Sequence, residues 1–405
     1  MHDVELFGRA LGLDEPWEVV GVAFDADQRR LDLRVDFAKG SRFACPRCAA
    51  AGCKVHDSEQ KTWRHLDFFE HRAYLTARVP RVVCAEHGTL AVQVPWARER
   101  SGFSLLFEAL VMAMVKQMPV KALADLVGES DMRIWRILHH YVDEAVEEQD
   151  LGGLVRVGID ETSSHRGHNY VTVFADLDER RAVYVTEDRD AETVLELACF
   201  IDTHGGDAGA VKHVSQDMSS AYVAGVRDHL PAAEITFDRY HIRQQLSRAI
   251  DEVRRAETKQ HRELLKDTRY LWLKRPQNLT EHQQDWLDEL LAQPLDTVRC
   301  YEHALKFDAF YDIEDPDMAE EYLRRWVADV KSSDIAPLIK FSAMLEDHWD
   351  GVVRWHRTRI NNGLLEGLNS LIQAAKRRAR GYRTNRNYIA MIYLVVGKLE
   401  PGPAI

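Results

Sequence analysis

A single acidic residue, Glu366, lies in a segment of the chain that is otherwise strongly basic. From Arg354 to Arg386 the sequence holds nine Lys or Arg residues and only this one acid. A lone carboxylate there either forms an ion pair at the surface or serves as a metal ligand where a nucleic-acid backbone will lie. The second interpretation requires other acidic residues in the chain that can share the metal.

Two aspartates meet that requirement, because each ends a segment with the pattern of a β-strand. Asp160 ends "VRVGID" and Asp217 ends "KHVSQD". Strands that finish side by side bring such carboxylates together, and two bare acids at close range repel each other unless a cation lies between them. Mg²⁺ prefers such a hard oxygen environment. With Glu366 supplied by a helix, the three acids predict a two-metal centre for phosphodiester cleavage.

Each aspartate also has a structural interpretation. An Asp at a strand end is often a turn residue or a helix N-cap, and Asp217 precedes "MSSAY", which can begin a helix. Asp238, in "FDRYHI", also ends a strand and competes for the second position, although the longer strand before Asp217 favours Asp217. Glu161 is left out, because successive side chains of a strand face opposite sides.

The segments around these acids predict a mixed α/β sheet that a distant helix completes. Three strand patterns are followed by a helix at about 191–203, then by a strand, a helix and a further strand that ends near residue 238. This order is typical of an α/β domain. Residues 240 to about 355 are mainly helical, and the last helices cover about 363–399.

The helix that carries Glu366 has two different faces. Its apolar face, which we expect to dock on the sheet, consists of Leu365, Leu368, Ile372, Ala375 and Ala379. Its polar face carries the acid, then amides, then positive charge, as Glu366, Asn369, Gln373, Arg377 and Arg380. That order suits a helix that runs from a metal site along a DNA backbone. In the run "KRRARGYRTNR" we expect phosphate contacts, weakened by salt, from Lys376, Arg377, Arg378, Arg380 and Arg383.

Four of the six cysteines fall within the first 84 residues, which favours metal binding over a disulfide framework. "CPRC" and "CAEH" form two close-spaced pairs with hairpin sequence between them, as expected of a structural tetrahedral zinc site made by Cys45, Cys48, Cys84 and His87.

Other interpretations of the cysteines stay open. Cys53 and His56, in "CKVH", form a rival second pair with the same spacing, and buried reduced thiols without a metal are a third possibility. Cys199, on an apolar helix face, and Cys300 are interpreted as core residues.

The stretch "VKALADLVGESDMRIWRIL" has the length and turn chemistry of a helix-turn-helix, with Gly128 at the turn and Ser130 as the cap of the second helix. Arg133 and Arg136 on that second helix are expected to contact phosphates or base edges. Most tryptophans are interpreted as core residues, and Trp349 and Trp355, beside the basic segment, are the two candidates for stacking on bases.

Length and charge allow this interpretation. A chain of 405 residues can hold two or three domains. The net charge of −12 argues mildly against binding to nucleic acid, but local patches decide binding, and the basic residues cluster near the C-terminus. We see no run of about 18 apolar residues and no signal-peptide pattern, so we expect a cytosolic protein without a membrane partner.

These motifs together resemble the transposases of the ISL3 family of bacterial insertion sequences. The resemblance is carried by "GIDET", "SQDMSSAYV", "FDRYHI" and "NNGLLEGLNSLIQAAKRRARGYR", and by the N-terminal "WRHLDFFEHRAYLTARVPRVVCAEHG" and "VPWARERSGFSLLFEAL". It extends over nearly the whole chain. It implies an RNase H-like core, split by a helical insertion, with Asp160, Asp217 and Glu366 as the catalytic triad. Asp238 and His241 resemble a supporting element near the active site of related transposases, and the family also carries a small zinc-binding domain.

We therefore predict a multidomain α/β protein with an RNase H-like catalytic core. The predicted segments are a β-rich zinc-ribbon domain at 1–100, a helix-turn-helix at 101–150, the first part of the core at 151–241, a helical insertion at 242–355, and the core completion with the catalytic helix and basic tail at 356–405.

The predicted function is that of a DNA transposase. We expect it to bind terminal inverted repeats of an insertion sequence and to use Mg²⁺ or Mn²⁺ for strand cleavage and transfer of the 3′-OH to target DNA, with Zn²⁺ in a structural role. Because DNA ends must be paired for this chemistry, a homodimer or larger assembly is expected, in the bacterial cytoplasm and at the nucleoid when bound to DNA. The alternatives are a domesticated DNA-binding protein without catalysis and an RNase H-like metal-dependent nuclease.

Overall fold

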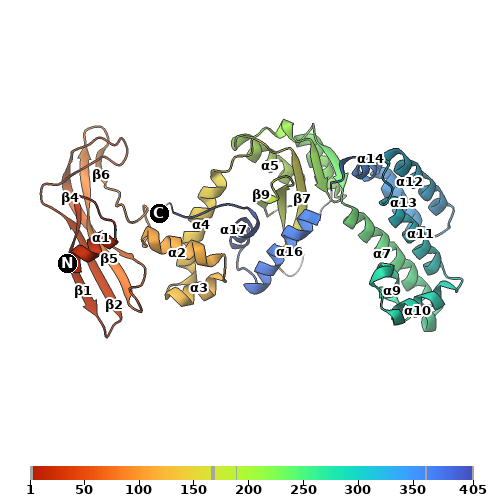
Figure 1. Ribbon diagram of the computed structural model, residues 1–405. Helices are drawn as coiled ribbons and strands as arrows, with labels where there is room; N and C mark the ends of the chain where they lie inside the picture. Colours follow the sequence, from red (N-terminus) through yellow and green to blue (C-terminus); the bar gives the residue numbers. More distant parts are fainter. Residues whose placement is uncertain (1–2, 166–168, 188, 361–362, 404–405) are drawn as a thin grey trace. The chain divides into compact units, whose positions relative to one another are not determined.

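The computed structural model describes residues 3–165, 169–187, 189–360 and 363–403. The chain divides into two compact units, one made of Met1–Val146 with Leu399–Ile405 and the other of Glu147–Lys398 (Figure 1). The end of the chain, from Leu399, therefore belongs with the first unit rather than with the core that we expected it to complete. Within the part of the chain that is described, no helix has the length and apolar character needed to span a membrane.

The first unit begins with a short helix, α1 (Asp3–Ala10), and a twisted β-sheet. The sheet has the strand order β1-β2-β5-β4-β3, with β6 paired to β5. Its strands are β1 (Trp17–Asp25), β2 (Arg30–Phe37), β3 (Arg42–Phe43), β4 (Cys53–Arg64), β5 (Arg72–Cys84) and β6 (Gly88–Ala91). Alternate residues of β2 and β5, such as Leu33 and Leu75, are buried, as expected of strands with one face on a core. The predicted β-rich region is confirmed.

Three helices follow in the same unit: α2 (Leu105–Val115), α3 (Val120–Val127) and α4 (Asp131–Glu147). Gly128 ends α3 with a φ of +67°, a left-handed conformation that glycine adopts without strain. The Ser130 hydroxyl accepts a hydrogen bond from the Arg133 backbone N–H at 3.4 Å. The turn and cap predicted for the helix-turn-helix are thus both present.

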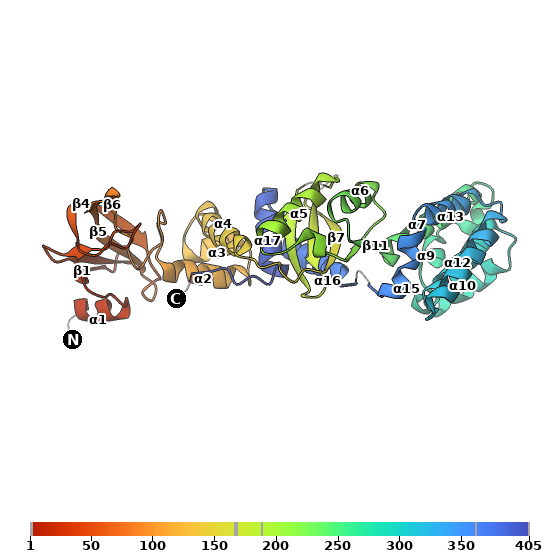
Figure 2. The ribbon, with the colours of Figure 1, turned by 90° about the horizontal axis from the view of Figure 1, so that it is seen from above.

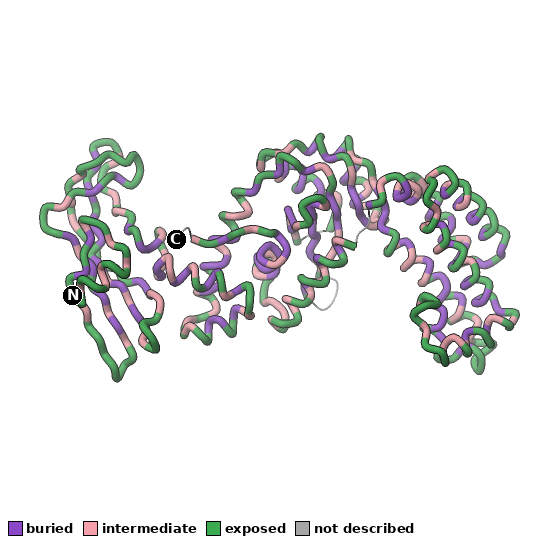
Figure 3. Tube along the Cα trace, in the orientation of Figure 1, coloured by how far each residue is buried: buried purple, intermediate pink, exposed green. Residues whose placement is uncertain are grey.

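The second unit is built on a five-stranded sheet of order β11-β10-β7-β8-β9, in which β8 and β10 are buried along most of their length (Figure 3). Strands β7, β10 and β11 run parallel, and β8 is antiparallel to both of its neighbours. The elements are β7 (Arg156–Ser163), β8 (Tyr170–Asp176), β9 (Arg181–Thr186), α5 (Glu192–Thr203), η1 (Ala208–Ala210), β10 (His213–Gln216), α6 (Ser220–His229) and β11 (Glu234–Phe237). The predicted order of strands and helices is confirmed.

Helices cover both faces of this sheet (Figures 1 and 2). Val157 and Ile159 of β7 share a buried cluster with Val194 and Leu197 of α5. Against the opposite face lie α16 (Gly363–Arg378) and α17 (Asn385–Val396), which return to the sheet from the end of the chain. The predicted apolar face of α16 is buried at Leu365, Leu368 and Ile372.

Gly158 allows α16 to approach β7 closely. A Cβ at this position would lie 2.7 Å from the Cδ1 of Leu365 and 2.8 Å from the Cδ2 of Leu177, distances that real side chains do not tolerate without a shift. The absent side chain of Gly158 therefore sets the separation between the strand that carries Asp160 and the helix that carries Glu366.

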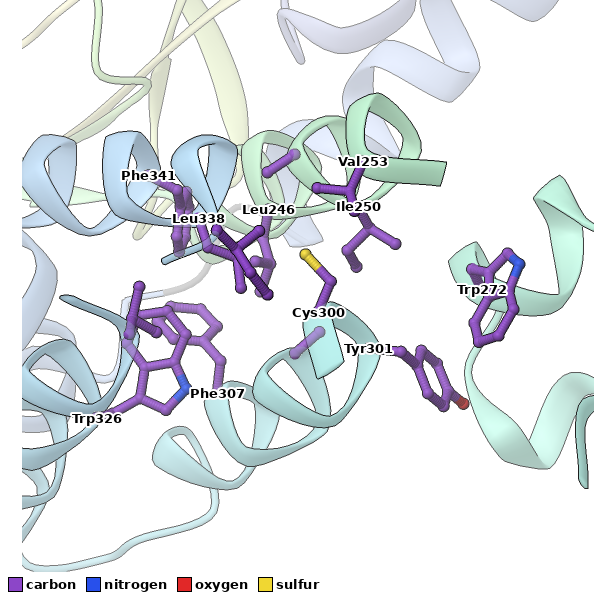
Figure 4. Packing of buried hydrophobic residues seen from close by; sticks show 14 of the residues in the cluster. Leu246, Ile250, Val253, Trp272, Cys300, Tyr301, Phe307, Trp326, Leu338 and Phe341 are labelled. Carbon is purple, nitrogen blue, oxygen red and sulfur yellow. The ribbon is translucent and has the colours of Figure 1, made fainter. Parts of the chain in front are cut away.

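Between β11 and α16 the chain forms a helical insertion with its own core (Figure 4). Leu246 and Ile250 of α7 pack with Phe307, Trp326 and other apolar residues of this core. The elements are α7 (Arg239–Glu257), α8 (Arg262–Leu265), α9 (Arg269–Leu273), η2 (Pro276–Asn278), α10 (Glu281–Leu291), α11 (Asp296–Phe310), α12 (Pro316–Lys331), α13 (Ala336–Asp347), α14 (Trp349–Val353) and α15 (Trp355–Thr358).

Two expectations about single side chains in the second unit need correction. Trp355 is buried and Trp349 packs against the insertion core, where its indole N–H donates to Glu320 at 3.1 Å, so neither indole is the exposed stacking platform that we considered. Cys300 is buried as expected, but Cys199 is exposed. The buried side of α5 is formed by Val194, Leu197 and Ala198 among others, and Cys199 faces outward at the next helical step.

Candidate active site and zinc centre

Acidic side chains gather where β7, β10 and β11 meet α16 and the start of α7. Asp160 lies on β7, Asp217 follows β10 and Asp238 follows β11, while Glu366 lies in the first turn of α16. Burial raises the pKa of the Asp160 carboxyl to about 6, opposed by the Glu161 backbone N–H and by His241, and the charges of Asp238 and Asp217 add to the increase. The parallel strands thus bring acids from separate segments into one electrostatic cluster.

Asp238 and His241 belong to the same cluster. Burial also raises the pKa of Asp238, and the negative charge of Glu366 contributes to that increase. His241, one turn into α7, places its Nε2 3.7 Å from the Asp238 carboxylate. The structure therefore brings together all five residues that the sequence placed in or beside the active site.

Hydrogen bonds from two amide side chains of α16 hold this helix against β7. The Asn369 Nδ2 donates to the Asp160 Oδ2 at 2.6 Å, and the Gln373 Nε2 donates to the Thr162 Oγ1 at 2.7 Å. Asn369 is one turn along the helix from Glu366, so the same face that carries the acid also holds the Asp160 carboxylate. Sequence reasoning placed both amides on this face without assigning them a role, and their spacing from Glu366 was the available signal.

Of the structural interpretations offered for the aspartates, the turn role is correct for Asp217, although the N-cap of α6 is Ser219, and it is wrong for Asp160, which lies inside β7 rather than at its end. A similar role is found at Asp238, so it does not distinguish Asp217 from Asp238. Asp217 accepts a hydrogen bond from the Ser219 backbone N–H at 2.9 Å, and Asp238 accepts one from the Tyr240 N–H at 3.0 Å as the N-cap of α7. In each case one carboxylate oxygen accepts a hydrogen bond from a backbone N–H two residues further along the chain. Asp217 is the less buried of the two, since Asp238 is only 5 % exposed.

Glu366 is exposed, and within the described residues it forms no ion pair. The surface ion pair that was the alternative interpretation of this carboxylate is therefore not formed. Glu161 lies on the opposite face of β7, where it accepts a hydrogen bond from the Tyr222 hydroxyl at 3.1 Å and faces Arg189 at 3.7 Å. This alternation along the strand agrees with the exclusion of Glu161 from the site.

The basic side chains at the C-terminal end of α16 have two kinds of surroundings, because one is bound to β7 and the others are exposed. Lys376 does not extend to solvent as expected: its Nζ donates to the Ser163 carbonyl at 2.6 Å, and burial lowers its pKa. Lys376 therefore adds a further hydrogen bond between α16 and β7. Exposed side chains remain at Arg377, Arg378, Arg380 and Arg383.

The acidic cluster fits a divalent cation by its donor chemistry. Carboxylate oxygens are the ligands that Mg²⁺ and Mn²⁺ prefer, and the raised pKa of Asp160 shows how unfavourable its charge is without a cation. Among the described residues only a Cys/His group has all its ligand atoms within 4.8 Å of one another. The acids are held more openly, as expected of like charges that repel.

That Cys/His group consists of Cys45, Cys48, Cys84 and His87. The two cysteines of the first pair lie in the turn between β3 and β4, and the second pair lies where β5 turns into β6. The Sγ atoms of Cys48 and Cys84 are 3.8 Å apart, and the Nδ1 of His87 is 3.7 Å from Cys84 Sγ and 4.0 Å from Cys45 Sγ. Three thiols and one imidazole at these separations suit tetrahedral zinc.

The backbone around Cys45 also favours its metal-binding form. The backbone N–H groups of Cys48 and Arg47 lower the pKa of the Cys45 thiol, and the thiolate is the form that binds zinc. The rival pair lies outside the group: the Cys53 thiol donates to the Ala50 carbonyl at 3.4 Å, and the exposed His56 faces Asp57 at 3.1 Å. The geometry thus favours Cys84 and His87, rather than Cys53 and His56, as the second ligand pair.

The two arginines proposed for the second helix of the helix-turn-helix differ in their surroundings. Arg133 forms an ion pair with Glu129 and lies over the Phe103 ring at 4.1 Å, so much of its side chain serves the packing of the unit. Arg136 is exposed, one turn further along α4. Of the two, Arg136 has the more accessible side chain.

Comparisons with known proteins agree with this arrangement. Residues 157–392 match the ISL3-family domain described as "Transposase", residues 92–142 match the helix-turn-helix domain of transposase family ISL3, and residues 41–87 match the zinc finger of the IS204/IS1001/IS1096/IS1165 transposases. The chain is 29% identical to the transposase for insertion sequence element IS1001 of Bordetella parapertussis, over 86% of this chain and 87% of the relative. It is 26% identical to the transposase for insertion sequence element IS1557 of Mycobacterium tuberculosis, over 99% of this chain and 97% of the relative.

Proposed function

Since this chain belongs to the ISL3 family of transposases, we propose that it binds the terminal inverted repeats of an insertion sequence, cleaves DNA there and joins the freed 3′ ends to target DNA. The observation that carries this proposal is the hydrogen bond of 2.6 Å from Asn369 to Asp160, which holds the helix of Glu366 against the strand of the first aspartate. The strand order β9-β8-β7-β10-β11, antiparallel only around β8, supports an RNase H-like core interrupted by the helical insertion.

Asp160, Asp217 and Glu366 would hold Mg²⁺ or Mn²⁺, and Cys45, Cys48, Cys84 and His87 would hold a structural Zn²⁺. When bound, the divalent ions supply activation of the attacking oxygen and charge stabilisation at the leaving oxygen. Water attacks the phosphodiester at the end of the element and leaves a 3′-hydroxyl, which then attacks a phosphodiester of the target. Each step exchanges one P–O bond for another, so no covalent protein–DNA intermediate is needed.

The chain's own residues prepare this chemistry. Asn369 orients the Asp160 carboxylate, Asp238 and His241 support the cluster, and the exposed arginines after Glu366 neutralise the DNA backbone. The zinc ribbon and α4, with Arg136 exposed, read the inverted repeat. Because two ends must be brought together, the active form is a dimer or larger assembly on DNA, at the nucleoid of a bacterial cytoplasm.

The decisive experiment follows a labelled duplex that carries the inverted repeat beside the gene, with Mg²⁺ or Mn²⁺. We expect the wild type to cut and join DNA, and Glu366→Gln to bind the duplex with unchanged affinity while cleavage falls by at least about a thousandfold. The matched control is Glu161→Gln, which changes an acid on the other face of β7 and should retain cleavage. Cleavage by Glu366→Gln at the wild-type rate would contradict the proposed triad, and cleavage without joining would favour a nuclease.

A further inference from the structure

We propose that a pocket beside the catalytic acids holds one unpaired nucleotide of the DNA strand that is being processed, an inference that rests on the proposed function. The pocket has a volume of about 560 Å³ and lies between the end of β10 and helices α7 and α13. It is lined by Asp217 and His241 of the acidic cluster, Gln245 and Arg248 of α7, and Lys340 and Phe341 of α13, among others. Nothing in the proposed cleavage chemistry uses its α13 wall.

The size and lining of the pocket suit a single nucleotide. A pocket of a few hundred Å³ is typical of sites for small ligands, whereas a DNA duplex is too wide to enter one. Phe341, which is 4 % exposed and belongs to the insertion core (Figure 4), contributes apolar surface, and the amide of Gln245 can pair with polar atoms of a base edge. Proteins that take a base out of the stack combine apolar contact with hydrogen bonds in this way.

The charges of the pocket point to a phosphate. Within the described residues neither Arg248 nor Lys340 forms an ion pair, and Arg248 donates only to the amide oxygens of Gln244 at 3.0 Å and Gln245 at 3.4 Å. Several other cations of the insertion are ion-paired, as Arg324 with Glu320, Arg325 with Glu321 and Lys331 with Glu346. The pocket wall also carries the carboxylates of Asp217 and Glu252, but in the described part of the chain neither forms an ion pair with Arg248 or Lys340. The two cations can therefore bind the phosphate that accompanies a base.

The position of the pocket connects it to the reaction. Asp217 belongs both to the acidic cluster and to the pocket wall, so a nucleotide held here is next to the scissile phosphate or within one step of it. Holding this nucleotide out of the duplex fixes the strand against the acids and lets the chain sense which base occupies that position. Arg248 and Lys340 are therefore positioning residues for the cleavage step.

The test uses inverted-repeat duplexes that carry 2-aminopurine at single positions around the cleavage site, bound to the full chain with Ca²⁺ in place of Mg²⁺. We expect fluorescence at one position to rise about twofold or more as its base leaves the stack. Replacing both Arg248 and Lys340 by Ala should abolish the rise and slow cleavage about tenfold, with end binding retained through the first unit. The matched control replaces Arg325 and Lys331, both paired and exposed, and should leave both readouts unchanged.

A duplex that is bound without a fluorescence rise at any position overturns the proposal, as does an Arg248→Ala/Lys340→Ala variant that behaves like the wild type. Gln245→Ala provides a second variant, in which we expect a smaller rise with phosphate contacts intact. The proposed function fails separately, because a wild-type chain that binds the repeat but cuts nothing with Mg²⁺ or Mn²⁺ contradicts transposition whatever the fluorescence shows.

Discussion

The negative charge of Asp160 is unfavourable in the folded protein, because burial raises the pKa of its carboxyl to about 6. The carboxyl is partly buried near the charges of Asp217 and Asp238, and the hydrogen bonds from the Asn369 amide and the Glu161 backbone N–H do not compensate for the lost hydration. A protein tolerates such a cluster where function needs it, because a bound cation converts mutual repulsion into shared attraction. The same carboxyl therefore links metal binding to the stability of the unit.

This linkage predicts how stability depends on pH in metal-free protein. Because the folded-state pKa of Asp160 is about 6 and its ordinary value is 3.8, the folded state binds more protons between these values, so stability falls as pH rises through that window. Asp160→Asn should remove this part of the dependence, making the variant relatively more stable above pH 6 by on the order of 2 kcal/mol. Urea unfolding with a chelator present, at several pH values from 4 to 8, measures the difference. Parallel stability curves for the two proteins would contradict it.

At the scale of elements, the site depends on how closely α16 lies against β7. Gly158 leaves room for Leu365, and the Asn369, Gln373 and Lys376 side chains then reach the strand. One missing side chain on the strand and three polar side chains on the helix thus determine where Glu366 stands relative to Asp160.

Gly158→Ala is expected to push α16 away from the strand. We expect a loss of about 1–3 kcal/mol of stability from overpacking and a larger fall in cleavage than in DNA binding. Gly153→Ala is the matched control, since a Cβ there meets nothing within 4 Å. Combining Gly158→Ala with Leu365→Ala should cost less than the sum of the two single changes, measured by denaturant unfolding. Strict additivity would show that the two positions do not meet.

The zinc site is also a property of elements, because its two pairs come from separate turns of one sheet. We expect Cys84→Ala to lose the bound zinc and most of the DNA affinity, and Cys53→Ala to keep both, since Cys53 lies outside the group of four. Metal content per chain and a binding titration provide the measurement, with the exposed Cys199→Ala as control. If Cys53→Ala lost the zinc and Cys84→Ala kept it, the second ligand pair would be Cys53 and His56.

At the scale of the whole molecule, the proposed function places the reading of DNA in one unit and its cleavage in the other. The zinc-finger and helix-turn-helix matches fall in the first unit and the transposase match falls in the second. From Leu399 the chain belongs to the first unit again, where Pro401 is buried. The first unit is therefore composed of both ends of the chain.

This division predicts that affinity and cleavage can be changed separately. Arg136→Ala should weaken binding to the inverted repeat and reduce the slope of log affinity against log salt by about 1, with the cleavage rate of the bound complex unchanged. Binding titrations at several salt concentrations and single-turnover cleavage at saturating protein give the two quantities. Arg325→Ala, on the insertion, is the control. If the slope of log affinity against log salt did not change, Arg136 would not be a phosphate contact in the DNA interface.

Much of this protein follows from local pattern. Strand alternation, helical faces and the spacing of cysteines are properties of short segments, and they were sufficient for the β-rich region, the helix-turn-helix, the order of the α/β elements and a short list of acids. Contacts between distant segments cannot be predicted from the pattern of any one segment. Packing decided that Lys376 and the two amides hold β7, that Cys84 and His87 rather than Cys53 and His56 join the first cysteine pair, and that Cys199 faces outward. It also left Arg248 and Lys340 without an ion pair among the described residues, in a pocket beside the acids, because side chains more than ninety residues apart in the chain meet there only after folding.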